Sequence, residues 1–168
     1  MSQQEAFAWF TGRLPKDWAS GPLEVTTDRD EILVVIPIDT PVVGGDATED
    51  DQAVAVEARV DGFRSDTRSH RIAIAREAER RFQRKVSWGV RVEDDTYTYR
   101  TLAAPAMTRL RMDERKVLDT LVEGGIARSR AEALAWCVRL VGQHEGEWLE
   151  ELRTAIGKVD EVRQRRET

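Results

Sequence analysis

Residues 107–141, MTRLRMDERKVLDTLVEGGIARSRAEALAWCVRLV, decide the fold that we expect for the last third of this 168-residue chain. The first six residues alternate between two sides, which predicts a short β-strand. One side carries Thr108, Leu110 and Met112, and the other carries Met107, Arg109 and Arg111. Arginine on the outer face of a strand contributes little to a core, and it suits an anionic partner.

Two amphipathic helices are expected to follow this strand. Asp113 is a candidate N-cap for the first helix, which should end at Gly124-Gly125. Ser129 and Glu132 form an S-x-x-E capping box, which predicts the start of the second helix. The apolar stripes are Val117, Leu118, Leu121 and Val122 in the first helix, and Leu134, Cys137, Val138 and Val141 in the second.

The strand and the two helices together comprise about 40 residues, which is below the size at which one chain builds a stable core alone. The apolar sides of these elements therefore require a second copy of the chain, and we expect a homodimer. The expected dimer core is made by Leu110, Met112, Leu118, Leu121, Leu134 and Val138.

The order of these features resembles the ribbon-helix-helix family of DNA-binding proteins. The residues that carry the resemblance are Arg109–Asp113, then Leu118, Leu121, Val122 and Gly125, and finally Ser129–Leu134. The resemblance implies that two strands pair as an antiparallel ribbon, which enters the major groove of DNA. It also implies base contacts from Met107, Arg109 and Arg111. The start of the second helix, at Ser129 and Arg130, would contact phosphate groups.

The residues before this unit predict a β-α-β-β layer, so the fold class expected for the whole chain is α+β. Glu31–Ile38, EILVVIPI, is a short β-branched run that is typical of a strand buried on both faces, with an end at Pro37. Residues 53–84 have the spacing of one long helix, whose weak points are Gly62 and the polar segment 64–70. The alternating runs within 86–102 predict a β-hairpin.

Two further helices are expected at the ends of the chain, a short one over residues 4–10 and an amphipathic one over 145–163. The second of these would pack on the dimer or extend it. We therefore divide the chain into an α+β domain (residues 1–104), a ribbon-helix-helix unit (105–143), and a C-terminal helix and tail (144–168).

The net charge of −5 is unevenly distributed along the chain. Residues 1–56 carry three basic and eleven acidic side chains, whereas residues 57–85 carry nine basic and five acidic ones. The overall charge argues against a protein that coats nucleic acid, so any such binding requires a local basic patch. Within the expected long helix, one roughly common face carries Arg64, Arg68, Arg71 and Arg76. This face is either solvated and salt-bridged or a nucleic-acid contact.

No motif in the sequence indicates an enzyme. The patterns G-x-x-x-x-G-K-[ST], G-x-G-x-x-G and H-E-x-x-H are missing, and neither His70 nor His144 has a set of neighbouring ligands, so both are expected at the surface. We therefore expect no catalytic residue, no metal and no cofactor. The single cysteine, Cys137, is expected in a core, and because one cysteine cannot form an internal disulfide, the sequence favours the reducing cytoplasm. No apolar run is long enough to span a membrane, so we expect no membrane partner.

These features predict a dimeric, sequence-specific DNA-binding protein that acts as a transcriptional regulator. Its N-terminal domain would then bind a protein partner or a small ligand. The alternative is a non-enzymatic interaction or scaffold protein, in which the ribbon-helix-helix unit only dimerises the chain.

Overall fold

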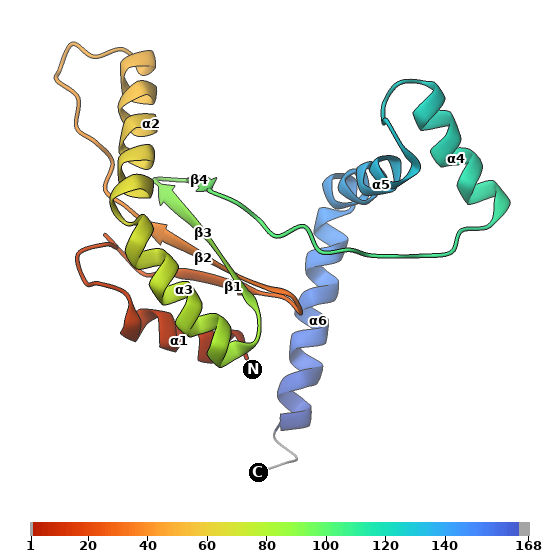
Figure 1. Ribbon diagram of the computed structural model, residues 1–168, viewed down its shortest axis with the longest axis horizontal. Coiled ribbons are helices and arrows are strands. Elements are labelled where there is room, and N and C mark those ends of the chain that lie inside the picture. The colour runs from red at the N-terminus through yellow and green to blue at the C-terminus, as the bar shows by residue number, and fades with distance from the viewer. Residues whose placement is uncertain (1, 165–168) are drawn as a thin grey trace. The chain divides into compact units, whose positions relative to one another are not determined.

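The computed structural model describes residues 2–164, with side chains up to Val159. The chain divides into two compact units, with the boundary after Pro105. Within the described residues, unit 1 contains four strands and three helices, and unit 2 contains three helices (Figure 1). The expected α+β class is therefore confirmed.

The sheet of unit 1 has the strand order β1-β2-β3-β4. Its centre is the parallel pair β2 (Glu31–Pro37) and β3 (Lys85–Val92). The outer strands, β1 (Glu24–Thr27) and β4 (Asp95–Thr98), pair antiparallel with β2 and β3. A parallel pair needs a long crossover, and the helices α2 (Glu49–Asp66) and α3 (Arg68–Phe82) provide it.

One face of this sheet packs against the helices of unit 1. Alternate strand residues on that face, such as Ile32, Val34 and Trp88, are buried against α1 (Gln3–Arg13), α2 and α3. The strand predicted from the alternation in β3 is thus confirmed, although Ser87 and Gly89 on its other face are buried as well. On the other face of β2, Val35 is buried but Leu33 is only half-buried, so the prediction of a strand buried on both faces is met only in part.

The predicted long helix is in fact two helices, and it begins earlier than expected. Thr48 caps α2, because its hydroxyl accepts a hydrogen bond from the Asp51 amide at 3.2 Å. In turn, the Asp51 carboxylate accepts a hydrogen bond from the Thr48 amide at 2.9 Å. Residues 49–51, which precede the helix predicted over 53–84, therefore form the first turn of α2, where acidic side chains interact favourably with the helix dipole. The break between α2 and α3 falls at Thr67, within the polar segment that we expected to be weak.

The expected hairpin is confirmed but is shorter than predicted, because β4 ends at Thr98. Strand β1 was not predicted at all, since four residues are too few for a clear alternation. The turn that joins β1 to β2 is organised by Asp28, whose carboxylate accepts hydrogen bonds from the amides of Asp30 (2.8 Å) and Glu31 (2.7 Å). These two bonds hold the pKa of Asp28 below its ordinary value.

Unit 2 contains α4 (Met112–Glu123), α5 (Arg130–His144) and α6 (Gly146–Gln164). These bounds agree with the two helices predicted from the capping signals and with the helix predicted for residues 145–163. The buried core of the unit is small. It consists of Leu118, Ala127 and Ala133, with partly buried Leu110, Leu121, Val122, Leu134 and Cys137 packed against it.

Candidate nucleic-acid interface

The segment before α4 is where the structure departs most from expectation. Residues 99–111 carry no regular secondary structure, so the strand predicted over 107–112 is not formed in the single chain (Figure 1). Met112 opens α4 instead of ending a strand. A strand needs a second strand to accept and donate its backbone hydrogen bonds, and the described residues of one chain pair none with this segment.

The N-cap of α4 lies two residues earlier than predicted, at Arg111 instead of Asp113. Arg111 is the N-cap, and its amide donates a 2.5 Å hydrogen bond to the carboxylate of Glu114. Asp113 is therefore not the cap but an acidic residue of the first turn. The extended backbone of Arg111 places the preceding residues at the entrance of the helix, where Arg115 donates a 2.6 Å bond to the Leu110 carbonyl.

The turn between α4 and α5 forms as the glycines predict. Gly124 is the C-cap of α4, and Gly125 has a φ of 74°, a left-handed conformation that glycine adopts without strain. The amides of Ile126 and Ala127 then donate to the Leu121 carbonyl at 3.0 and 3.3 Å. These bonds bring Ala127 into the small core of unit 2.

The start of α5 carries the predicted cap, with one difference. Ser129 is the N-cap, and its hydroxyl accepts a 3.3 Å bond from the Glu132 amide. The carboxylate of Glu132, however, accepts from the Arg128 amide at 2.8 Å, one residue earlier than a capping box requires. The amides of Arg130 and Ala131 lie in the first helical turn, where a helix offers no acceptor of its own. They are available to an anion.

The side chain of Arg130 is committed to another contact. Its guanidinium forms a bidentate ion pair with the Asp119 carboxylate, at 2.6 and 2.7 Å, which connects α5 to α4. This hydrogen-bonded pair lowers the pKa of Asp119 and raises that of Arg130. A phosphate contact at this position would therefore use the backbone of Arg130, unless the anion displaces Asp119.

The three predicted base-contacting side chains, Met107, Arg109 and Arg111, are all exposed, and Met107 is 97% exposed. Within the described part of the chain, neither Arg109 nor Arg111 has a carboxylate within 4.0 Å. The half-buried Leu110 between these arginines packs against the core of unit 2. The alternation expected for residues 109–111 is thus present as burial, although no strand has formed.

The six predicted dimer-core residues fall into three groups. Leu118 is buried within the single chain. Half-buried positions are occupied by Leu110, Leu121 and Leu134. Met112 and Val138 are 62% and 66% exposed. The exposed apolar residues of unit 2 also include Val117, Ile126, Val141, Trp148, Leu152, Ile156 and Val159. Among the described side chains of unit 2, more large apolar residues are therefore exposed than buried.

The remaining sequence expectations concern single residues. Cys137 is half-buried beside the core of unit 2, so its predicted burial is met in part. His70 and His144 are both exposed, as predicted. Among the side chains that the structure describes, no three His, Cys, Asp or Glu residues gather as a metal site would require. None of the described helices combines the length and the apolar character needed to cross a membrane.

The arginine face predicted on the long helix is not a single exposed face. Arg71 is buried, and it donates hydrogen bonds to the Thr67 hydroxyl (2.9 Å) and the Arg64 carbonyl (2.6 Å) at the end of α2. Both Arg64 and Arg71 also lie over the ring of Tyr99, at 5.4 and 4.7 Å. Burial lowers the pKa of Arg71 and raises that of Tyr99 to about 12. These residues join the two helices to the segment after β4, so their role is structural.

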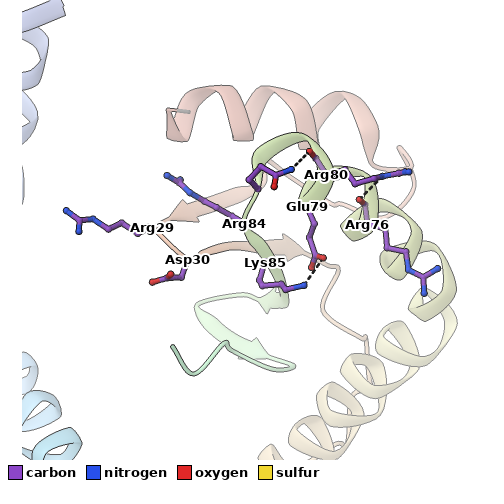
Figure 2. A pocket seen from close by; sticks show the side chains of 8 residues that line it. Arg29, Asp30, Arg76, Glu79, Arg80, Arg84 and Lys85 are labelled. Carbon is purple, nitrogen blue, oxygen red and sulfur yellow. Dashed lines mark hydrogen bonds and ion pairs between the residues drawn. The ribbon is translucent and has the colours of Figure 1, made fainter. Parts of the chain in front are cut away.

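A basic depression on unit 1 was missed by the sequence reasoning, apart from Arg76. It measures about 780 Å³ and is lined by Arg29, Asp30, Arg76, Glu79, Arg80, Gln83, Arg84 and Lys85 (Figure 2). The signal in the sequence was the cluster of basic residues in segment 76–85. The contribution of Arg29, more than 40 residues away, depends on the β1–β2 turn lying beside the end of α3.

Fold and site together define a class of protein. It has an α+β unit with a mixed four-stranded sheet, followed by a unit of capped helices with an uncovered apolar surface. The particular family follows from sequence similarity. The chain belongs to the family of Rv1265-like proteins, because residues 4–98 match the N-terminal domain of that family. Residues 111–163 match the Mb1296 C-terminal domain.

Relatives in mycobacteria span nearly the whole chain. The uncharacterized proteins Mb1296 of Mycobacterium bovis and Rv1265 of Mycobacterium tuberculosis are each 49% identical to it over 158 residues. The match covers 94% of this chain and 68% of each relative. No solved structure matches the chain. Neither family description names a ribbon-helix-helix protein, so that resemblance stays a prediction.

Proposed function

We propose that this protein is a cytoplasmic, dimeric, sequence-specific DNA-binding protein that acts as a transcriptional regulator. Two copies of residues 107–111 pair as an antiparallel ribbon that enters the major groove. The observation that carries the proposal is the exposed alternating segment Met107–Arg111, which precedes a capped helix pair with an uncovered apolar surface.

The uncovered apolar surface supports dimerisation. Among the side chains of unit 2 that the structure describes, the apolar ones buried in the single chain are Leu118, Ala127 and Ala133, and Met112 and Val138 are more than half exposed. Full burial of an aliphatic side chain contributes about 1.5 to 3 kcal/mol. A second copy that covers several of these side chains on each protomer supplies enough energy for a stable dimer, even after the loss of translational and rotational freedom.

The segment before α4 supports the ribbon. Its backbone amides and carbonyls have no strand partner within the described chain, and an identical segment of a second copy supplies one. Pairing would keep Leu110 against the helices and turn Met107, Arg109 and Arg111 to the opposite side. The guanidinium of arginine matches the O6 and N7 acceptors of guanine, and each such pair discriminates by about 1 to 3 kcal/mol.

The start of α5 supports a phosphate contact. The Ser129 cap satisfies the Glu132 amide and leaves the amides of Arg130 and Ala131 directed out of the helix start. Residues 106–144 also carry seven basic and five acidic side chains, so this segment is positive within an acidic protein. Phosphate contacts of this kind orient a protein on DNA, while the ribbon reads the bases.

The experiment is a binding assay with selected DNA. Duplexes enriched by the wild-type protein from a random library are titrated with wild type, with R109A/R111A, and with R153A/K158A as a control of equal charge on α6. We expect R109A/R111A to lose the preference for the selected duplex and the control to keep it. Equal affinity of R109A/R111A and wild type for that duplex would reject the proposal.

A second candidate is a non-enzymatic scaffold that uses unit 2 only to dimerise. The ion pair between Arg130 and Asp119 favours it, because that arginine is already neutralised by its own chain. The same library selection separates the two candidates. A stable dimer that enriches no duplex would support the scaffold.

A further inference from the structure

The basic depression of unit 1 has a different electrostatic character from the rest of this acidic chain. Its lining combines five basic and two acidic side chains. One of the acidic side chains, Glu79, is already engaged, because its carboxylate binds the Lys85 ammonium at 3.1 Å and accepts from the Val86 amide at 3.4 Å. Asp30 is the other, so the depression retains an excess of positive charge.

The arginines of this depression lack carboxylate partners of their own. Within the described residues, no carboxylate lies within 4.0 Å of the guanidinium of Arg29, Arg76, Arg80 or Arg84. The other acidic side chain of α3, Glu77, is bound to Arg13 of α1 at 2.7 Å. The Arg80 side chain makes only a long 3.3 Å bond to the Arg76 carbonyl. These guanidinium groups are therefore available to an external anion.

The arrangement of these groups favours an extended anion. Figure 2 shows the guanidinium groups of Arg29 and Arg84 on one side of the depression, and those of Arg76 and Arg80 directed the other way. They do not converge on a point, as a site for one phosphate would require. Arg76 and Arg80 are four residues apart on α3 and so lie about 6 Å apart along the helix axis. A phosphate backbone, with one charge per ~1.7 Å of duplex axis, presents anions at many such separations.

We infer that the basic depression of unit 1 binds the phosphate backbone of duplex DNA without reading its sequence. The inference rests on the proposed function in so far as DNA is the polyanion. It adds a second contact on the same chain, through Arg29, Arg76, Arg80 and Arg84. Two linked contacts bind more tightly than either alone, because binding of the first raises the effective concentration of the second. In an acidic protein whose ribbon reads the DNA sequence, the basic depression supplies the salt-dependent part of the affinity.

The test measures the salt dependence of binding to a fluorescent random-sequence duplex of 20 base pairs by anisotropy. The full-length proteins are wild type, R76Q/R80Q, R109A/R111A, and the control K16Q/R59Q. This control removes two exposed basic residues of unit 1 that do not line the depression. Circular dichroism and thermal unfolding verify that each variant is folded. Glutamine suits the exposed helical positions of Arg76 and Arg80.

We expect R76Q/R80Q to weaken binding and to reduce the slope of log K against log [NaCl] by about 2, close to 0.9 for each lost phosphate contact. The control should change neither quantity by a comparable amount. A slope for R76Q/R80Q equal to that of the control overturns the inference, even where R109A/R111A loses DNA. If R76Q/R80Q loses affinity for both the random and the selected duplex while R109A/R111A loses affinity for neither, the inference stands and the proposed ribbon is rejected.

Titration with poly-glutamate covers the competing class of partner. If poly-glutamate binds wild type as tightly as the duplex and loses affinity in R76Q/R80Q, the surface belongs to acidic proteins and the inference is overturned. Weak binding of poly-glutamate, alongside a duplex affinity that depends on Arg76 and Arg80, supports the phosphate backbone.

Discussion

Replacement of Val138 by alanine measures directly whether the apolar surface of unit 2 is a dimer interface. In the single chain this residue is 66% exposed on α5, so its truncation should leave the fold of the protomer almost unchanged. In a dimer that covers the surface, the same truncation removes apolar contact from both protomers. The variant therefore separates the stability of the protomer from that of the dimer.

The expected magnitude follows from the exposed fraction. Alanine lacks two carbon atoms of valine, worth about 1.6 kcal/mol when fully buried, at about 0.8 kcal/mol for each. Because 66% of Val138 is still exposed in one chain, dimerisation would bury about two thirds of this value, or about 1 kcal/mol per protomer. Two protomers together lose about 2 kcal/mol, which raises the dimer Kd by about 30-fold.

The assay is sedimentation equilibrium of wild type and Val138→Ala over a range of concentrations that brackets the wild-type Kd. Val42→Ala is the matched control, because Val42 is 99% exposed and lies in the loop after β2. Its Kd should equal that of wild type. A Kd for Val138→Ala within threefold of wild type would refute the reasoning, as would a wild-type protein that stays monomeric at high concentration.

Three further predictions concern the stability of the two units. Arg71→Met removes two hydrogen bonds to the end of α2 and should lower the free energy of unfolding by about 2 to 4 kcal/mol in a urea titration, whereas the exposed Arg68→Met should change it by less than about 0.5 kcal/mol. Gly125→Ala imposes a side chain on a φ of 74° and should destabilise unit 2 by about 1 kcal/mol, while Gly142→Ala, in open space on α5, should stabilise it. The pKa of Asp28 is lower in the folded state than its ordinary value of 3.8, so its stabilising contribution is present above this pH and is lost as the pH falls through the folded pKa. Asp28→Asn should therefore flatten the acid limb of a stability-versus-pH curve, and an unchanged limb would show that the turn bonds do not depend on the charge.

The local signals for unit 2 were reliable where one short segment contains the whole cause. Gly125 predicts the end of α4, because the left-handed conformation of the turn costs glycine nothing. Ser129 predicts the start of α5, because a hydroxyl at that position satisfies an amide that the helix leaves open. The candidate reader arginines, Arg109 and Arg111, were also predicted locally, from alternation over six residues, and their role stays a prediction.

Other features were missed, either because the surrounding composition concealed a local signal or because their cause lies in distant residues. The early start of α2 depends on Thr48 and Asp51, whose acidic neighbours have the composition of a loop. The burial of Arg71 depends on the ring of Tyr99, which directly follows the edge strand β4 and is 28 residues away along the chain. Helical periodicity alone groups Arg71 with exposed arginines, because the spacing within a helix does not show which side chains of other elements pack against it.

The amino-acid sequence by itself determined the α+β class, the strands β2 and β3, and the capped helices of unit 2. Each of these follows from periodicity, β-branched composition or a cap within a few residues. Only the tertiary structure decided that residues 107–111 form no strand in a single chain, because a strand's backbone groups need a partner that one copy does not supply. It alone also placed Arg29 in the lining of the same depression as Arg76, Arg80 and Arg84, since the pairing of β1 with β2 sets the position of their turn.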